Sequence, residues 1–209
     1  MQKKEDIFFE LALKSNSLLL GDFTLKSGKK SPYFFNVGAF FNQGHIGELA
    51  ELYADVILES GLEFDLIFGP AYKGIPLAAA ISTMLNLRSS KPFPFAFDRK
   101  EAKSHGEGGS IVGELKDKRV LIVDDVLTAG TALKQSIDTI NNEGGTVAGS
   151  LVALDREEIL HGDLARDIIR NDFSIDVMSI ARISQLVEFF YLSDREEEAT
   201  TIKNYLTNL

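Results

Sequence analysis

The chain has 209 residues, of which 44% are hydrophobic, so it is long enough to bury the core of one domain. Its 31 acidic residues outnumber its 22 Lys and Arg residues, and the net charge of −9 argues against nucleic acid or an anionic membrane as the main partner. The absence of cysteine excludes disulfides and cysteine metal sites. No apolar stretch reaches the length of a signal peptide or a membrane span, so we expect a cytoplasmic protein.

The first part of the chain alternates between helical and extended patterns. Apolar residues recur at helical spacing near the N-terminus and over residues 45–60, where Gly61 follows as a C-cap. A short apolar run then predicts a buried strand at 64–68, and a helix is expected at 74–86.

The rest of the chain repeats this alternation. Short apolar runs predict strands over 93–97, 120–123, 147–154 and 173–180, and a helix over 131–142. Strands that alternate with helices are typical of an α/β fold with a mostly parallel sheet flanked by helices. Because ligands bind such sheets at the carboxyl ends of the strands, we expect the site in the loops after those strands.

Two acids and a run of small and hydroxylic residues follow the strand at 120–123. Asp124 and Asp125 are expected where the strand leaves the sheet, and paired carboxylates accept hydrogen bonds from vicinal ribose hydroxyls or position a hydrated metal. The hydroxyls of Thr128 and Thr131, with N–H groups at a helix start, suit a phosphate dianion. The plainer alternative is a strand end with two solvated acids and an ordinary helix cap.

The run VLIVDDVLTAGTA at 120–132 resembles the PRPP-binding signature of the type I phosphoribosyltransferases. The resemblance implies one phosphoribosyltransferase domain over 1–209, with a Rossmann-like sheet, a small hood mainly from about 1–40 with C-terminal elements, and a flexible lid at about 99–113. It implies PRPP contacts along the whole turn, from Asp124, Asp125, Val126, Leu127, Thr128, Ala129, Gly130, Thr131 and Ala132.

Further segments narrow the resemblance to the bacterial orotate phosphoribosyltransferases. The run FTLKSGKKSPYFFN at 23–36 implies a PRPP contact at Lys26 and an orotate site lined by Phe34 and Phe35. An aromatic face suits a flat pyrimidine ring. The alternative is a hood strand with ordinary core phenylalanines.

The run GPAYKG at 69–74 is similar to the pyrophosphate loop of that family, which often carries a cis peptide bond not followed by proline. The similarity implies PRPP contacts from Tyr72 and Lys73. The alternative is a plain turn with an exposed lysine.

The run DRKEAKSHGEGG at 98–109 resembles the lid, in which cations neutralise a pyrophosphate leaving group and glycines permit movement. The resemblance implies PRPP contacts from Arg99, Lys100, Lys103 and His105, with Lys103 expected to have the largest effect on rate. It leaves open whether His105 is a general acid or only a phosphate ligand. In this family the lid reaches the neighbouring subunit's site, which implies a homodimer. The alternative is a solvated, charged loop.

The run ALDR at 153–156 implies that Arg156 pairs with the orotate carboxylate, with Thr128 as a further orotate contact. A planar guanidinium suits a planar carboxylate. The alternative is a surface arginine paired with Asp155 or Glu157. Beyond it we find no diagnostic motif, and we expect Glu157, Glu158 and His161 on a solvated helix and the acidic run at 194–198 on a charged helix face.

The resemblance implies transfer of the phosphoribosyl group from PRPP to orotate, a step of pyrimidine biosynthesis. The implied catalytic residues are Lys73, Lys103, His105, Asp124 and Asp125. Mg²⁺ is expected as a cofactor that PRPP carries, without direct protein ligands, through water to Asp124 or Asp125. Two alternatives remain: a transferase for a purine base, which has no carboxylate to meet Arg156, and a non-catalytic PRPP sensor, which would lack the lid cations and carry a basic surface.

Overall fold

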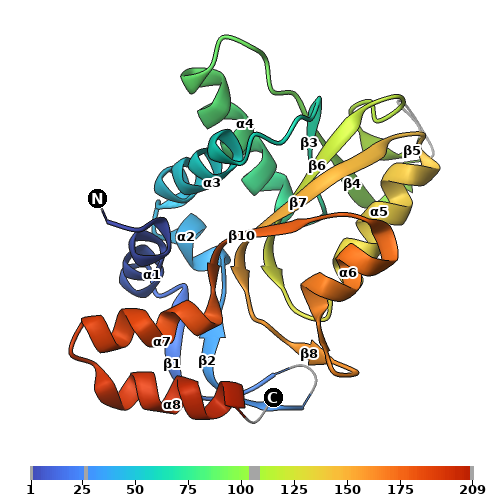
Figure 1. Ribbon diagram of the computed structural model, residues 1–209. Coiled ribbons are helices and arrows are strands. Elements are labelled where there is room, and N and C mark those ends of the chain that lie inside the picture. The colour runs from blue at the N-terminus through green and yellow to red at the C-terminus, as the bar shows by residue number, and fades with distance from the viewer. Residues whose placement is uncertain (1, 26–27, 104–108, 208–209) are drawn as a thin grey trace.

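The computed structural model describes residues 2–25, 28–103 and 109–207, without the side chains of 100–103 and 109 (Figure 1). The helices are α1 (Lys4–Lys14), α2 (Gly38–Asn42), α3 (Ile46–Ser60), α4 (Gly74–Arg88), α5 (Thr131–Asn142), α6 (Ala165–Phe173), α7 (Ile183–Leu192) and α8 (Glu196–Thr207). The strands are β1 (Leu18–Thr24), β2 (Lys30–Phe35), β3 (Leu66–Gly69), β4 (Phe95–Lys103), β5 (Gly109–Val112), β6 (Arg119–Leu127), β7 (Thr146–Asp155), β8 (Ile159–Leu160), β9 (Asp163–Leu164) and β10 (Val177–Arg182).

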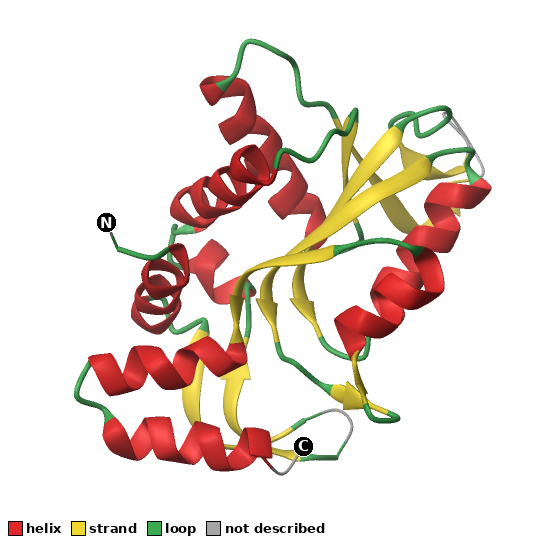
Figure 2. Cartoon of the chain, viewed as in Figure 1, coloured by secondary structure: helices red, strands yellow, loops and turns green. Residues whose placement is uncertain are grey.

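A six-stranded sheet in the order β10-β7-β6-β3-β4-β5 forms the centre of the fold (Figure 2). Its strands pair in parallel, except that β5 runs antiparallel to β4 at one edge. This arrangement confirms the predicted α/β fold with a mostly parallel sheet. It also brings the ends of β3, β6 and β7 to one edge of the sheet, where the sequence predicted the site.

Helices cover both faces of the sheet. Alternate residues of β6 enter opposite cores: Leu121 and Val123 join the core beneath α1, α3 and α4, whereas Val120 and Ile122 join the core beneath α5 and α6 (Figure 1). β6 is therefore buried on both sides, which explains its continuous apolar run.

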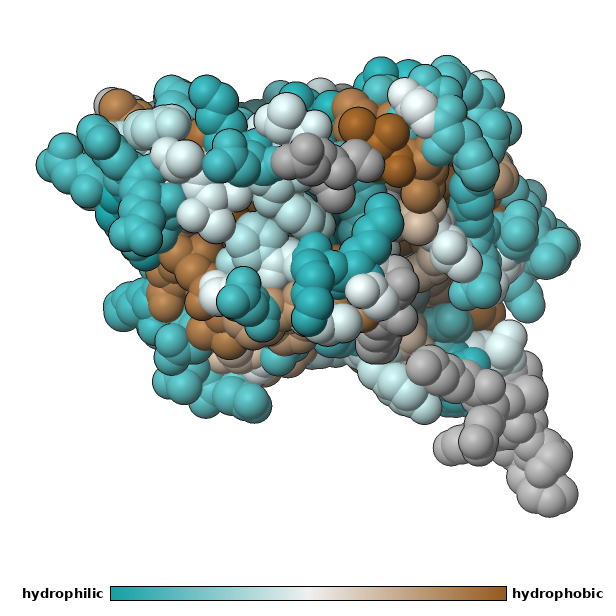
Figure 3. All heavy atoms as spheres, turned by 90° about the horizontal axis from the view of Figure 1, so that it is seen from below, coloured by the Kyte–Doolittle hydropathy of each residue, from teal (hydrophilic) through white to brown (hydrophobic). Residues whose placement is uncertain are grey.

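A small antiparallel hairpin of β1 and β2 lies beyond the end to which the parallel strands point, beside α7 and α8 (Figure 2). Aromatic rings join it to both ends of the chain: Phe35 packs against Phe8 of α1, and Tyr33 meets Tyr205 of α8 edge-on. Figure 3 shows this end of the molecule, where hydrophilic side chains dominate the edges and apolar patches lie between them. Within the described residues, no helix is both long enough and apolar enough to cross a membrane.

Several strands and helices begin or end at other residues than the sequence predicted, and each difference has a physical reason. The strand expected to end at 97 continues as β4 to Lys103, and part of the polar stretch after it forms β5, so strand pairing overrides the glycine-rich, polar composition. Phe173 ends α6 instead of opening a strand, because Ser174 adopts a left-handed conformation (φ 57°) that terminates the helix.

Glu157, Glu158 and His161 are not helical, contrary to expectation. They flank or join β8 and β9, whose turn has positive φ at His161 and Gly162. The polar composition that suggested a solvated helix instead serves a hairpin and its ion pairs.

Candidate functional site

Asp124 and Asp125 lie inside strand β6, not after it. The strand continues because Val126 and Leu127 pair with Leu154 and Asp155 of β7. Asp125 is only 6% exposed. The alternative of two solvated acids at a strand end is therefore wrong: burying a carboxylate has a cost that a partner must offset.

The environment of Asp124 raises the pKa of its carboxyl to about 7, chiefly because burial disfavours the charged form and secondly because the charge of Asp125 is adjacent. The backbone N–H of Asp125 donates to Asp124 Oδ1 at 2.8 Å. The Tyr53 hydroxyl donates to the Asp124 carbonyl oxygen at 2.6 Å and so fixes the backbone here from α3.

A hollow of about 330 Å³ opens along the run that follows. Gly130 permits the turn, because it has φ 76° and an added Cβ would lie 3.3 Å from Ile169 Cδ1. The hollow is lined by Asp124, Val126, Leu127, Thr128, Gly130, Thr131, Ala132, Leu133, Gln135, Ser150 and Val152. Most of the residues expected to bind PRPP along 124–132 thus share one hollow with the first turn of α5, where backbone N–H groups favour anions.

The loop between β3 and α4 brings Lys73 to the acids. The Lys73 side chain is half exposed, as the plainer alternative expected, but its Nζ lies 2.9 Å from Asp125 Oδ2 and so joins this loop to the acids of β6. The peptide bond between Ala71 and Tyr72 is cis, as the family resemblance implied. The loop is tight: an added Cβ on Gly69 would lie 2.1 Å from the Gly74 carbonyl oxygen. The Tyr72 side chain is exposed beside Lys73.

Arg99 lies in β4, next to the point where the pairing with β5 begins. Arg99 Nη1 is buried without a hydrogen-bond partner among the described residues, which suits an anionic ligand. For Lys100 and Lys103 the structure describes the backbone of β4 alone. Lys26 and His105 lie outside the described residues.

Arg156 follows β7 and is 7% exposed, so the alternative of a surface arginine is wrong. Its guanidinium lies 4.9 Å over the Tyr33 ring and its Nε lies 3.4 Å from Glu158 Oε1. Nε and Nη2 nevertheless have no hydrogen-bond partner among the described residues. The Arg156 backbone N–H donates to the Leu127 carbonyl oxygen at 3.1 Å, so the backbone of Arg156 lies beside the residue that precedes Thr128.

Phe34 and Phe35 do not lie together. They alternate along β2, so Phe34 is 40% exposed and meets Phe23 at 5.6 Å, whereas Phe35 is buried in the core against Phe8 and Phe40. Only the Phe34 ring is exposed for contact with a ligand.

Sequence reasoning missed three residues that hold the site. Tyr33 lies beneath Arg156, Tyr53 holds the Asp124 backbone, and Asp98 Oδ1 accepts from the Ala71 N–H at 2.6 Å. The period-2 alternation of β2 could have placed Tyr33 opposite Phe34. No local pattern marks the other two, because their partners are 71 and 27 residues away in sequence.

The sequence matches known proteins along most of its length. The family described as "Phosphoribosyl transferase domain" matches residues 40–176. The orotate phosphoribosyltransferase of Salmonella newport (strain SL254) is 46% identical over 193 residues, which cover 92% of this chain and 90% of that protein.

Solved structures agree. The crystal structure of orotate phosphoribosyltransferase from Francisella tularensis is 40% identical, with a TM-score of 0.85 over 97% of this chain and 98% of that one. The orotate phosphoribosyltransferase of Mycobacterium tuberculosis H37Rv, in complex with PRPP, shares the fold at 20% identity, with a TM-score of 0.64 over 86% of this chain and 96% of that one. The chain therefore belongs to the orotate phosphoribosyltransferases, pentosyltransferases of the type I phosphoribosyltransferase family.

Proposed function

We propose that this orotate phosphoribosyltransferase recognises its base through Arg156 and its donor through the run 124–132 and the loop at 69–74. In the reaction, the bond from ribose C1 to pyrophosphate breaks as the orotate ring nitrogen bonds to C1 and loses its proton. The products are orotidine 5′-monophosphate and pyrophosphate. The observation that carries the proposal is the buried Arg156 guanidinium, whose Nε and Nη2 have no hydrogen-bond partner among the described residues.

On the base side, the unpartnered nitrogens of Arg156 suit the orotate carboxylate. Glu158 is the one carboxylate that pairs with this guanidinium among the described residues, and it leaves Nε and Nη2 without a hydrogen bond, so an incoming carboxylate can supply both. The exposed ring of Phe34 offers an apolar face for the pyrimidine, and Phe35 contributes through the core that supports β2. Thr128 offers a hydroxyl at the boundary between base and ribose.

On the donor side, Asp124 and Asp125 accept from the ribose hydroxyls, and residues 128–132 hold the 5′-phosphate at the start of α5. Lys73 and Arg99 meet the pyrophosphate, with Tyr72 beside them. Lys26, Lys100, Lys103 and His105 complete the phosphate contacts in this proposal. These groups act by positioning and by stabilising charge as pyrophosphate departs.

The two acids also suit a Mg²⁺ ion that arrives with PRPP. Mg²⁺ in phosphate sites keeps several waters, and the adjacent carboxylates of Asp124 and Asp125 can accept hydrogen bonds from those waters without binding the ion directly. Among the described residues, no group of three or more His, Asp or Glu side chains could hold a metal. When bound, the ion neutralises phosphate charge, while Lys73 and the two carboxylates orient the donor.

The hairpin of β1 and β2 with α7 and α8 serves, in this proposal, as the hood over the base, and the lid at about 99–113 closes over the pyrophosphate of a partner subunit in a homodimer. Together with the six-stranded sheet they make one phosphoribosyltransferase domain over 1–209.

A spectrophotometric assay tests the proposal. Orotate absorbance should fall only when PRPP and Mg²⁺ are both added, and Lys103→Ala should slow that fall by about 100-fold or more if the lid neutralises the leaving group. Arg156→Ala should raise KM for orotate and leave KM for PRPP close to wild type. A flat trace with wild-type protein, or an Arg156→Ala variant with unchanged KM for orotate, would refute the assignment of the base site.

A further inference from the structure

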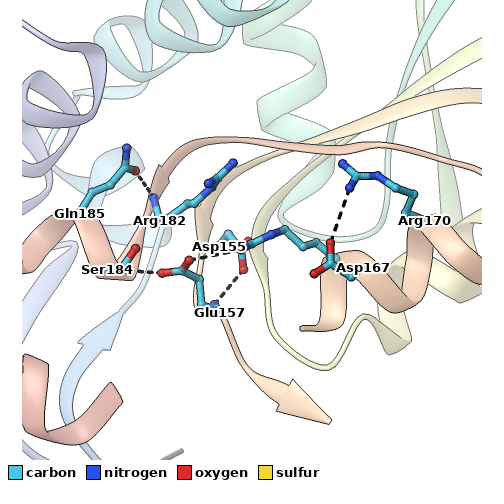
Figure 4. Close-up of polar contacts among 8 residues, drawn as sticks. Asp155, Glu157, Asp167, Arg170, Arg182, Ser184 and Gln185 are labelled. Carbon is cyan, nitrogen blue, oxygen red and sulfur yellow. Dashed lines mark hydrogen bonds and ion pairs between the residues drawn. The ribbon is translucent and has the colours of Figure 1, made fainter. Parts of the chain in front are cut away.

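A buried ion-pair network holds the short segment that carries Arg156. Asp155, the last residue of β7, is 3% exposed, and its Oδ2 accepts from Arg166 Nη1 of α6 at 2.6 Å. The same nitrogen lies 3.3 Å from Glu157 Oε1. Figure 4 shows the Asp155 carboxylate beside the Glu157 backbone nitrogen and the Glu157 carboxylate extending towards Ser184. Arg166 therefore binds the residues on both sides of Arg156.

The segment needs such support because its backbone is unfavourable. Glu157 has φ 53°, a left-handed conformation that residues other than glycine seldom adopt. Its N–H donates to Asp155 Oδ1 at 2.8 Å, which closes a turn around Arg156. A conformation of this kind persists where its surroundings fix it, and Arg166 Nη1 contributes by pairing with the Glu157 carboxylate at 3.3 Å.

The network also reaches the hood. Glu157 Oε2 accepts from the Ser184 N–H in the first turn of α7 at 2.8 Å (Figure 4). One carboxylate thus joins α6, through Arg166, to α7, and α7 packs against α8, which contacts β2 of the hairpin that carries Tyr33 and Phe34. The same ion-pair network therefore holds the turn that carries Arg156 and the first turn of α7 in the proposed hood.

The ion pairs of Arg166 are important because all three side chains that form them are largely buried. The side chains of Arg166, Asp155 and Glu157 are 17%, 4% and 15% exposed, so removing the cation leaves two carboxylates close together and poorly solvated. Arg170, one turn along the same helix, contrasts with it: its side chain is 57% exposed and pairs with the solvent-facing acids Asp167 and Asp176. Exposed pairs of that kind contribute little.

We infer that Arg166 is a positioning residue for orotate recognition: without touching the substrate, it holds the Asp155–Glu157 turn so that the Arg156 guanidinium meets the orotate carboxylate. The inference rests on the proposed role of Arg156.

Steady-state kinetics of Arg166→Gln tests it. Without the ion pairs of Arg166, the turn that carries Arg156 can shift, and the guanidinium then meets the orotate carboxylate in a poorer geometry. KM for orotate should therefore rise by about 10- to 100-fold. KM for PRPP should stay within about twofold, because none of the proposed donor contacts lies on β7, on α6 or on the turn between them. Arg166→Lys, which keeps a cation within reach of both acids, should recover most of the loss. Arg170→Gln is the matched control and should behave as wild type.

A double variant separates this inference from the proposed function. If Arg166 acts through Arg156, then adding Arg166→Gln to Arg156→Ala should change KM for orotate no further. An unchanged KM for orotate in Arg156→Ala alone would overturn the base-site proposal itself. A normal KM for orotate in Arg166→Gln, or equal rises in both KM values, would overturn the inference and leave Arg156 in place. Should Arg166→Gln fail to fold, Glu157→Gln and Arg166→Lys carry the same comparison, with a selective rise in KM for orotate expected in Glu157→Gln.

Discussion

At this site, the environment of a single side chain can lower the stability of the folded protein. Asp124 is the clearest case, because burial and the charge of Asp125 raise the pKa of its carboxyl to about 7. In the unfolded chain an aspartate ionises near pH 4. Between those two values the folded protein keeps a proton that the unfolded chain has lost, so stability falls as pH rises through this window. Above it both states are ionised and the full penalty remains.

Asp124→Asn should therefore stabilise the protein while it impairs activity. Its advantage over wild type in denaturant unfolding should be small near pH 4 and should grow up to about pH 7, after which it levels off. The amide oxygen can still accept from the Asp125 N–H, so the backbone should not change. Asp138→Asn, at an exposed position on α5, serves as the control and should show no such pH-dependent gain. Equal stability of wild type and Asp124→Asn at pH 8 would contradict this account.

At the scale of elements, sequence patterns located the strands and helices but not the contacts between them. The helix at 131–142 was predicted with the bounds that the structure has, because periodicity and the glycines that follow it are local signals. The ends of β4 and β6 were wrong, since pairing with β5 and β7 extends them through residues that local propensity disfavours. Site residues with motifs were identified from the family resemblance. Those that act by long-range hydrogen bonds, such as Asp98, carry no local signal.

Asp98 joins two of these elements. Its Oδ1 accepts from the Ala71 N–H in the loop before α4, and its backbone pairs with Ile111 of β5. Asp98→Ala should leave that N–H without its acceptor and loosen the 69–74 loop. Because a hydrogen bond to a charged group is worth about 1.5–3 kcal/mol, KM for PRPP should rise by roughly 10- to 100-fold. Asp98→Asn keeps an oxygen acceptor and should retain most of the affinity; an unaltered KM for PRPP in Asp98→Ala would show that the loop does not depend on this bond.

At the scale of the whole molecule, the protein places a cationic site on an acidic body. The net charge is −9, yet three of the proposed substrate contacts are cations on this sheet: Lys73 in the loop after β3, Arg99 within β4 and Arg156 directly after β7. Both ends of the chain cover this region: α1 and the hairpin from the N-terminus, α7 and α8 from the C-terminus, joined by the contact of Phe9 with Phe189. A local basic pocket suits anionic substrates whatever the net charge.

The proposed homodimer predicts that each active site takes residues from both chains. Lys73 lies in the loop before α4, while Lys103 ends β4 at the lid. If each lid serves the neighbouring site, Lys73→Ala and Lys103→Ala inactivate different halves of the same composite site. A mixed dimer of the two variants then contains one site with both lysines and one with neither.

Unfolding and refolding the two nearly inactive variants together should therefore restore activity. Random pairing makes half of the dimers mixed, and one complete site in each gives about a quarter of the wild-type activity. Refolding each variant alone, in parallel, controls for recovery of either one by itself. If the lid instead closes over its own subunit, every site in every dimer lacks one lysine, and the mixture stays as inactive as its parts. The size of the restored activity thus distinguishes a lid that acts between subunits from one that acts within a subunit.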